Sequence, residues 1–164
     1  MEETAVIGPL RPDDVGAIVG VVEETGVFRP GEVEVAGELV EAAASEGEEA
    51  SGYYVRVARA EKRVVGYACW GATPCTEGTF DLYWIAVSPS YGRRGVAAAL
   101  LAEVEQDVIS RRGRLLIAET SGTEPYAAAR SFYVRTGFRE EARIPDFYKS
   151  GDDKVIYVKT LWRS

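Results

Sequence analysis

Hydrophobic positions in the N-terminal third of the chain recur at helical spacing. Residues 12–26 open with a proline and two carboxylates and continue as an apolar periodic run, which predicts a first helix. A second helix is expected from Pro30 onward, with one apolar stripe formed by Val35, Leu39 and Val40. The small-residue and glutamate-rich stretch over residues 42–52 is typical of a helix end followed by a solvated loop.

From about residue 53 the spacing changes to that of strands. Residues 53–58 and 64–70 are rich in β-branched and aromatic side chains and are joined by a charged turn, so they predict a hairpin. A third strand is expected over residues 79–87. A glycine-containing loop then leads into a helix over about residues 94–110.

The C-terminal third alternates again between strand and helix patterns. Residues 114–120 predict a buried strand, and residues 125–136 predict a helix that Gly137 ends. Two last strands are expected over residues 138–143 and 154–161, joined by a charged hairpin loop at 146–154. With a short first strand at residues 4–10, the predicted order is β-αα-βββ-α-β-α-ββ, a mixed α/β fold.

Length and composition favour one soluble domain. The 164 residues, 46% of them hydrophobic and 27% charged, fit a single domain over 1–164 with a sizeable core. No apolar run approaches the ~18 residues of a membrane span. The acidic start lacks the basic and apolar regions of a secretory signal, so we expect a cytoplasmic protein without membrane contact.

Charge and residue counts exclude several kinds of chemistry. The sequence holds no histidine, which removes Ser-His-Asp and Cys-His nucleophiles and every His-ligated metal site. Two cysteines, Cys69 and Cys75, are too few for a structural zinc site, so we expect no metal and two reduced thiols. The net charge of −7 disfavours nucleic acid and favours a cationic substrate such as an amine.

One segment carries the pattern of an anion site. After the strand that ends at Val87, glycines and two arginines precede a helix, in the run Gly92-Arg93-Arg94-Gly95-Val96-Ala97-Ala98. Unpaired amides at a helix N-terminus attract an anion, and glycine lets the backbone approach it closely. A diphosphate suits this loop. An ordinary strand-to-helix turn with two solvated arginines is the alternative, and neither a phosphate loop nor Gly-x-Gly-x-x-Gly is present.

Two motifs resemble the GNAT superfamily of acyl-CoA-dependent N-acetyltransferases. The family signature Arg/Gln-x-x-Gly-x-Gly/Ala is matched at Gly95 and Ala97, with Gly92 in place of the usual Arg or Gln. A second hallmark, aromatic-Tyr-x-x-x-Gly-Phe on a later helix, is matched from Phe132 to Phe138 without a gap. The strand and helix order extends the resemblance over most of the chain. It implies a central mixed sheet flanked by helices and splayed between the fourth and fifth strands.

The resemblance implies acetyl-CoA as co-substrate and a set of residues that bind it. The backbone of Ile85, Ala86 and Val87 would pair with the pantetheine amides, as an added strand does. Amides of the loop and first helical turn would hold the diphosphate. Tyr126 stands where many relatives have an asparagine at the pantetheine arm. With Arg130 and Tyr133 included, the expected cofactor residues are Ile85, Ala86, Val87, Gly92, Arg93, Arg94, Gly95, Val96, Ala97, Ala98, Tyr126, Arg130 and Tyr133.

Tyr133 is the candidate acid, because the family places this phenol beside the CoA sulfur. A phenol with a pKa of ~10 can hydrogen-bond or protonate a thiolate whose pKa is ~8.5. The alternative reading is a core tyrosine on the helix face.

Asp81 and Glu119 are the two candidate bases, since relatives place a carboxylate at one position or the other. By strict alternation Asp81 shares a face with Tyr83, Ile85 and Val87, while Glu119 ends the next strand. A carboxylate accepts a proton from an ammonium only if its own pKa is raised, the amine's pKa is lowered or water relays the proton. The sequence leaves open which of the two acts, and each could also be a solvated strand-end carboxylate.

The implied reaction is transfer of an acetyl or short acyl group to a primary amine by direct attack in a ternary complex. Phe28, Glu32 and Tyr83 are candidates for binding the acceptor, a small molecule or peptide. A protein lysine or N-terminal amine is the alternative acceptor. A CoA-binding sensor or interaction module without turnover is the alternative function. Relatives also imply a homodimer through the last strands.

Overall fold

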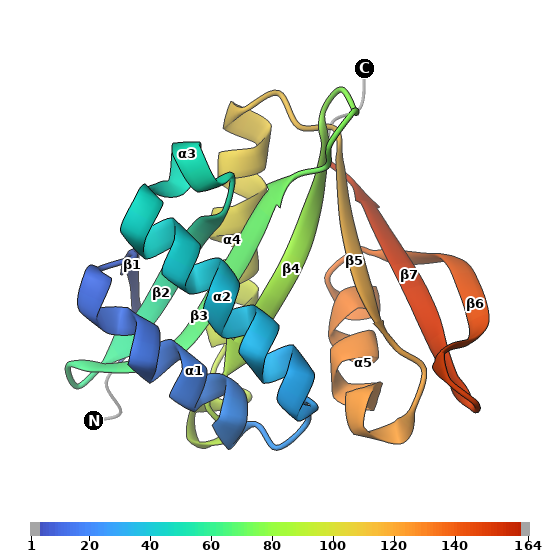
Figure 1. The fold of residues 1–164 in the computed structure, drawn as a ribbon, viewed down its shortest axis with the longest axis horizontal. Helices are drawn as coiled ribbons and strands as arrows, with labels where there is room; N and C mark the ends of the chain where they lie inside the picture. Colours follow the sequence, from blue (N-terminus) through green and yellow to red (C-terminus); the bar gives the residue numbers. More distant parts are fainter. Residues whose placement is uncertain (1–3, 162–164) are drawn as a thin grey trace. The chain divides into compact units, whose positions relative to one another are not determined.

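The computed structural model describes residues 4–161, and its elements follow the predicted order (Figure 1). The strands and helices are β1 (Val6–Pro9), α1 (Val15–Glu24), α2 (Pro30–Glu46), α3 (Glu48–Ser51), β2 (Tyr54–Ala60), β3 (Arg63–Ala72), β4 (Thr79–Val87), α4 (Val96–Ser110), β5 (Leu115–Ser121), α5 (Ala127–Arg135), β6 (Arg139–Lys149) and β7 (Asp152–Thr160). Short 3-10 turns at Pro12–Asp14, Pro89–Tyr91 and Glu124–Tyr126 precede α1, α4 and α5. The acidic first three residues lie outside the described part.

The described strands form a mixed sheet in the order β1-β2-β3-β4-β5-β7-β6. The pairs between β4 and β5 are parallel and join Thr79–Leu82 to Leu115–Ala118, whereas β1–β2, β2–β3, β5–β7 and β6–β7 are antiparallel. The mixed α/β fold is therefore confirmed. The predicted splay concerns residues beyond these parallel pairs and stays a prediction.

The chain divides into two compact units. Unit 1 comprises the described residues up to Gly71 together with Tyr83–Gln106, and unit 2 comprises Ala72–Leu82 and the described residues from Asp107 onward. The single domain over residues 1–164 stays a prediction.

In unit 1, helices cover both faces of the β1-β2-β3 strands. Figure 1 shows α1 and α2 on one face and α4 behind the other. The α1/α2 face holds a buried apolar cluster in which Ile18, Val22 and Val40 of the helices meet Tyr67 and Cys69 of β3. Fully burying a side chain of this size stabilises a fold by roughly 1.5–3 kcal/mol, so this cluster anchors the two helices.

Asp14 fixes the start of α1 against the sheet. Its carboxylate accepts a hydrogen bond from the Arg11 backbone N–H at 2.7 Å and forms an ion pair with Arg59 of β2.

The β2-β3 hairpin turns at Glu61 and Lys62, whose φ angles of 49° and 62° are those of a type I′ turn. Two consecutive left-handed residues match the twist of the flanking strands, which explains why this charged turn is tight.

The predicted stripe of α2 is partly wrong. Val40 is buried, but Val35 is 45% exposed, and Ala36 and Ala43 take the buried positions beside Val40. Alanines at these positions give no signal in a hydrophobic pattern, although they fit where the helix lies close to its neighbour.

Over residues 42–52 the expected helix end is confirmed, since α2 ends at Glu46, but the short helix α3 stands where a loop was expected. Glu48 of α3 accepts hydrogen bonds from the Val55 backbone N–H at 2.9 Å and from Arg56 Nη1 at 3.2 Å. The glutamate-rich stretch therefore connects the helices to β2 instead of being only solvated.

In unit 2, the β6-β7 hairpin lies beside β5, and Gly137 with a φ of 95° ends the preceding α5 as predicted. Strands continue through most of the segment expected to be a loop at 146–154, with only a short turn at Ser150 and Gly151. Four residues of β6, Pro145 to Tyr148, stand between the pairs Ile144↔Lys154 and Lys149↔Asp152, which makes a large bulge opposite Asp153.

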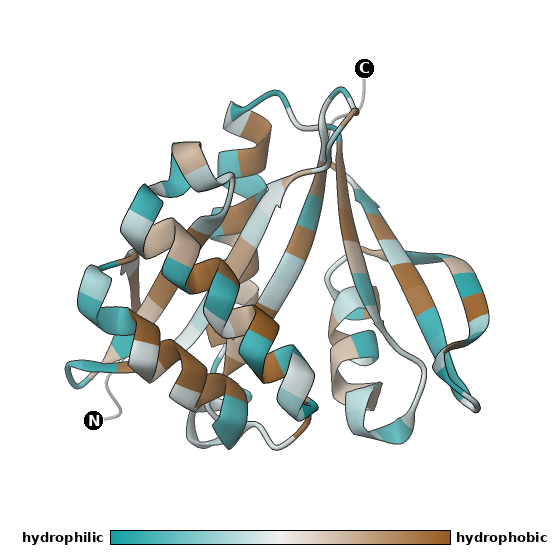
Figure 2. Cartoon of the chain, viewed as in Figure 1, coloured by the Kyte–Doolittle hydropathy of each residue, from teal (hydrophilic) through white to brown (hydrophobic). Residues whose placement is uncertain are grey.

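Figure 2 shows hydrophilic and hydrophobic positions interspersed along β6 and β7. Nearly all of β6 is exposed, as expected for a strand at the end of the sheet order. Within residues 4–161, no helix combines the length and apolar character needed to span a bilayer.

Candidate functional site

The second half of β4, in unit 1, does not keep strict alternation. A Cβ added to Gly71 would lie 3.0 Å from the Tyr83 ring, and one added to Gly66 would lie 3.3 Å from Val87. These glycines are five residues apart on β3 and so point to opposite faces. Tyr83 and Trp84, although consecutive, both pack against the α1/α2 cluster. Tyr83 and Val87 therefore lie on opposite faces, contrary to the prediction, and a β-bulge explains the change.

This irregularity affects the backbone predicted to bind an extended ligand, Ile85, Ala86 and Val87. Ala86 is buried against the α1/α2 cluster, and the next residue after the strand, Ser88, donates its N–H to the Val65 carbonyl at 2.8 Å. Bulges disrupt ladder pairing locally and are frequent next to active sites. The end of β4 is thus held at Ser88, while the bulged residues before it can pair with a ligand strand.

The loop after β4 has the geometry of an anion site. A 3-10 turn at Pro89–Tyr91 leads to Arg93 with a φ of 62° and Gly95 with a φ of 77°, both left-handed. Helix α4 begins at Val96, and its first backbone bond runs from the Ala99 N–H to the Gly95 carbonyl at 2.9 Å. The N–H groups of Val96, Ala97 and Ala98 precede that bond and have no acceptor within the helix.

Two arginines add positive charge to this helix N-terminus. Arg93 is exposed, and the Arg94 guanidinium lies 4.9 Å above the centroid of the Tyr91 ring. Gly92 has a φ of −60°, which any residue adopts, but a Cβ added there would lie 3.3 Å from the Pro89 carbonyl oxygen, a tight contact. Amides, helix dipole and guanidinium groups together suit a diphosphate.

The predicted acceptor residues are placed in unit 1 but do different things. Phe28 and Tyr83 belong to aromatic pairs, with ring centroids 6.4 Å apart for Phe28–Trp84 and 5.7 Å apart for Tyr53–Tyr83. Glu32 caps α2, because its carboxylate accepts the Arg29 backbone N–H at 2.8 Å and pairs with the Arg29 guanidinium at 3.2 Å. A structural role for Glu32 is thus visible, and its role toward an acceptor stays a prediction.

Tyr133, the candidate acid, lies in unit 2 on α5 and is 7% exposed. Its ring centroid is 5.8 Å from that of Phe132, 5.2 Å from that of Phe138 and 5.5 Å from that of Tyr157. Burial raises the pKa of the Tyr133 phenol, and the nearby Tyr157 raises it further. The phenol therefore stays protonated, and acts as a hydrogen-bond donor, throughout the neutral range.

Arg130 and Tyr126 shape the loop between β5 and α5. Arg130 Nη1 donates to the carbonyls of Ser121 at 2.8 Å and Thr123 at 2.7 Å, and Tyr126 is buried. Ser121 Oγ in turn donates to the buried Asp152 carboxylate of β7. These bonds fix the chain that leads into α5, and cofactor contacts by Arg130 and Tyr126 stay predictions.

The two candidate bases lie together on unit 2 strands. Asp81 faces Ile117 across the parallel β4–β5 pair, and Glu119 lies two residues further along β5 on the same face. Asp81 is half-buried and accepts a hydrogen bond from Thr73 Oγ1 at 2.7 Å. Glu119 is more exposed and forms an ion pair of 2.7 Å with Lys154 Nζ of β7.

Burial is the largest influence on Asp81 and raises the pKa of its carboxyl group. The hydrogen bond from Thr73 lowers that pKa, the negative charge of Glu119 raises it, and the Lys154 ammonium lowers it. The net result is an elevated pKa. Asp81 is therefore a stronger base than a solvated aspartate, whereas Glu119 is paired with the Lys154 ammonium.

Acid and base candidates lie on opposite faces of the unit 2 strands. Glu119 is opposite Ile156 and on the same face as Lys154, whereas Tyr133 packs on Tyr157, whose partner is Ala118. Neighbouring residues of a strand point to opposite faces.

Sequence reasoning missed Thr73 and Lys154, which surround Asp81 and Glu119. Neither belongs to a motif, and Lys154 reaches Glu119 only through the antiparallel β5–β7 pairing. A correct register for that pair, which the hydrophobic pattern alone does not specify, would have been needed to find the contact.

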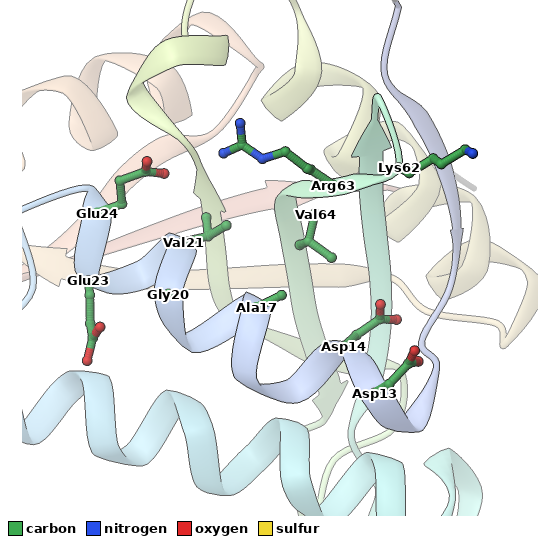
Figure 3. A pocket seen from close by; sticks show the side chains of 10 residues that line it. All are labelled: Asp13, Asp14, Ala17, Gly20, Val21, Glu23, Glu24, Lys62, Arg63 and Val64. Carbon is green, nitrogen blue, oxygen red and sulfur yellow. The ribbon is translucent and has the colours of Figure 1, made fainter.

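A hollow of about 790 Å³ in unit 1 lies beside α1 and the β2-β3 turn (Figure 3). Carboxylates of α1 and of the turn before it line one side, with Lys62 and Arg63 on the other. One of these carboxylates, Asp14, is already engaged with Arg59. None of the predicted site residues lines this hollow.

In the part of the chain that the structure describes, no group of three or more His, Cys, Asp or Glu is placed to hold a metal ion.

Comparison with known proteins identifies the family. Residues 49–140 match the family model of the acetyltransferase (GNAT) domain. A GNAT-family structure from Desulfovibrio desulfuricans is 46% identical, with a TM-score of 0.92, and the match covers 97% of this chain and 100% of that one. No curated protein matches the chain.

More distant structures share the fold. The ribosomal-protein-S18-alanine N-acetyltransferase of Escherichia coli is 20% identical, with a TM-score of 0.77 and coverage of 98% and 96% of the two chains. A Salmonella typhimurium protein solved with its cofactor acetyl-CoA is 18% identical, with the same TM-score and coverage. The family model spans more than half of the residues, and the Desulfovibrio protein matches nearly all of them. The chain therefore belongs to the GNAT family of acetyltransferases.

Proposed function

We propose that this protein transfers an acetyl or short acyl group from acetyl-CoA to a primary amine by direct attack in a ternary complex. One observation carries the proposal: the loop from Gly92 to Gly95 leads into the unpaired amides at the start of α4, with Arg93 exposed beside them. In a GNAT acetyltransferase, this geometry suits the CoA diphosphate. The bulged end of β4 then offers the backbone of Ile85, Ala86 and Val87 to the pantetheine arm.

The chemistry follows from the carboxylates and the phenol of unit 2. We assign Asp81 as the base that takes the acceptor's proton, because its pKa is raised and its second oxygen is not used by Thr73. Tyr133 donates a hydrogen bond to the departing thiolate of CoA. In the ternary complex, the amine adds to the thioester carbonyl as Asp81 takes its proton, and the tetrahedral intermediate then expels the CoA thiolate, which accepts the hydrogen bond from Tyr133.

The acceptor is a small molecule or peptide with a primary amine, and the net charge of −7 favours cationic acceptors. Phe28 and Tyr83 offer aromatic surface in unit 1 to such a molecule. A homodimer and a cytoplasmic location remain part of the proposal, and sedimentation at micromolar concentration tests the dimer.

Calorimetric titration with acetyl-CoA tests the cofactor without requiring the acceptor. We expect one-to-one binding, weaker binding of dephospho-CoA, and no binding of NAD. Arg93→Ala should raise the Kd of acetyl-CoA about tenfold, because a guanidinium–phosphate contact contributes roughly 1.4 kcal/mol or more, and added salt should reduce the difference.

Arg112→Ala is the matched control. Arg112 is also exposed and has nearly the same backbone, with a φ of 61°, but lies just past the other end of α4. Its substitution should leave the Kd unchanged. Equal effects of the two substitutions would exclude Arg93 from the diphosphate site. Tight binding without thiol release for any amine in a broad screen would support a CoA-binding sensor instead of an enzyme.

A further inference from the structure

Lys154 of β7 is held between a carboxylate and an aromatic ring, beside the candidate base Glu119. Its ammonium lies 2.7 Å from Glu119 Oε2 and 4.2 Å from the centroid of the Phe147 ring. The side chain is only 16% exposed, which is low for a lysine. A carboxylate and an aromatic face together hold an ammonium in one position.

The β6 bulge is what brings Phe147 over Lys154. Asp146, with a φ of 52°, donates its backbone N–H to Asp153 Oδ1 at 3.0 Å and accepts the Gly151 N–H on its own Oδ1 at 2.7 Å. These bonds fix the left-handed residue that redirects the chain. Phe147 is 48% exposed, so burial of its ring does not explain this backbone. Its contacts are the Lys154 ammonium and the Tyr148 ring.

Each charged or polar group that acts on Asp81 comes from a different segment. Thr73 follows β3, Glu119 lies on β5 and Lys154 lies on β7. The two carboxylates share a face, so without a cation beside them each would disfavour the charge of the other. Lys154 pairs with Glu119, whereas Asp81 accepts its hydrogen bond from Thr73.

We propose that Lys154 is a positioning residue that holds Glu119 in an ion pair and thereby leaves Asp81 as the carboxylate that takes the acceptor's proton. The inference rests on the proposed function for the role of Asp81. Phe147 and the β6 bulge support this role, because they hold the Lys154 ammonium against Glu119. Lys154 itself transfers no proton in this scheme, and its charge acts through the two carboxylates.

A carboxylate titration followed by NMR tests the proposal without an acceptor. The protein is labelled with ¹³C at aspartate Cγ, and Asp81→Asn identifies the Asp81 signal by its loss. Lys154→Met removes a charge that favours ionised Asp81, so its pKa should rise. Glu119→Gln removes a charge that opposes ionisation, so the same pKa should fall. Lys154→Arg keeps the charge and should stay close to the wild type.

Lys159→Met is the matched control, since Lys159 lies on the same strand but on the opposite face. Its ammonium donates to the Thr136 carbonyl at 2.7 Å. This substitution should leave the Asp81 titration unchanged. An unmoved Asp81 signal in Lys154→Met, or the same movement in Lys159→Met, would overturn the inference. Thermal melts of all variants identify any that fail to fold.

Activity separates this inference from the proposed function. Once an acceptor amine is found, the acidic limb of the kcat/KM profile should move to higher pH in Lys154→Met and disappear in Asp81→Asn. Transfer that Asp81→Asn leaves intact would refute the base assignment. Loss of the limb in Asp81→Asn together with an unmoved limb in Lys154→Met would refute only the role of Lys154.

Discussion

Replacing Tyr133 with phenylalanine removes one oxygen from a closely packed aromatic group. The ring lies 5.2 Å from Phe138 and 5.5 Å from Tyr157, and these contacts do not depend on the hydroxyl. Among residues 4–161, the described contacts of the Tyr133 side chain are ring contacts. We therefore expect Tyr133→Phe to change the free energy of unfolding by less than about 1 kcal/mol.

The effect on turnover follows from the raised pKa of Tyr133. Because burial raises the pKa of the phenol above that of a thiol, full proton transfer to the CoA thiolate is uphill, and a hydrogen bond to sulfur is the main contribution. A hydrogen bond to a charged group is worth about 1.5–3 kcal/mol. At about 1.4 kcal/mol per factor of ten, kcat should fall roughly 10- to 150-fold.

Single-turnover release of CoA thiol, with acetyl-CoA bound and an acceptor amine added, measures the chemical step. Tyr157→Phe serves as the control, because it removes a hydroxyl from the same aromatic cluster but from a residue on β7. We expect normal acetyl-CoA binding in both variants and a slow chemical step only in Tyr133→Phe. An unchanged chemical step in Tyr133→Phe would remove the phenol from the mechanism and leave it a core residue.

Three further substitutions test other parts of the structure. Gly92→Arg should tighten acetyl-CoA binding about threefold to tenfold by calorimetry, because a φ of −60° accepts any residue and the new guanidinium adds charge at the diphosphate. The Pro89 carbonyl, 3.3 Å from the new Cβ, has to shift slightly, and an unchanged or weaker Kd would contradict the prediction. In Cys75→Ser, Cys69 is the remaining thiol; it is 1% exposed, and burial raises its pKa to about 12. The folded variant should therefore not react with a disulfide reagent, whereas unfolding should expose one reactive thiol. Asp14→Asn should lower the free energy of unfolding by about 3 kcal/mol in denaturant titrations, because it removes the carboxylate that balances the charge of Arg59 and leaves the Pro9 carbonyl as acceptor; a loss under about 1 kcal/mol would mean that water replaces the carboxylate.

The sequence by itself determined the order of the main strands and helices and the place of the glycine-containing loop before α4. Residues 79–87 were predicted as a strand and form β4 over the same range, since a run of β-branched and aromatic residues ending at Ser-Pro is a local signal. The C-terminal end of α5 could also be predicted, because a glycine such as Gly137 readily takes the left-handed backbone that ends a helix. Both GNAT motifs are contiguous in the chain and are readable for the same reason.

Only the tertiary structure decided how the chemical groups are paired. Glu119 and Lys154 are 35 positions apart by their numbers and meet because β7 pairs antiparallel with β5. Glu32 proved to be the cap of its own helix, and the bulge in β4 moved Tyr83 to the face opposite Val87. Such outcomes depend on strand register and on packing against distant segments. Register and packing determine the surroundings of a side chain, and the surroundings determine its pKa and its partners. No local sequence pattern specifies them.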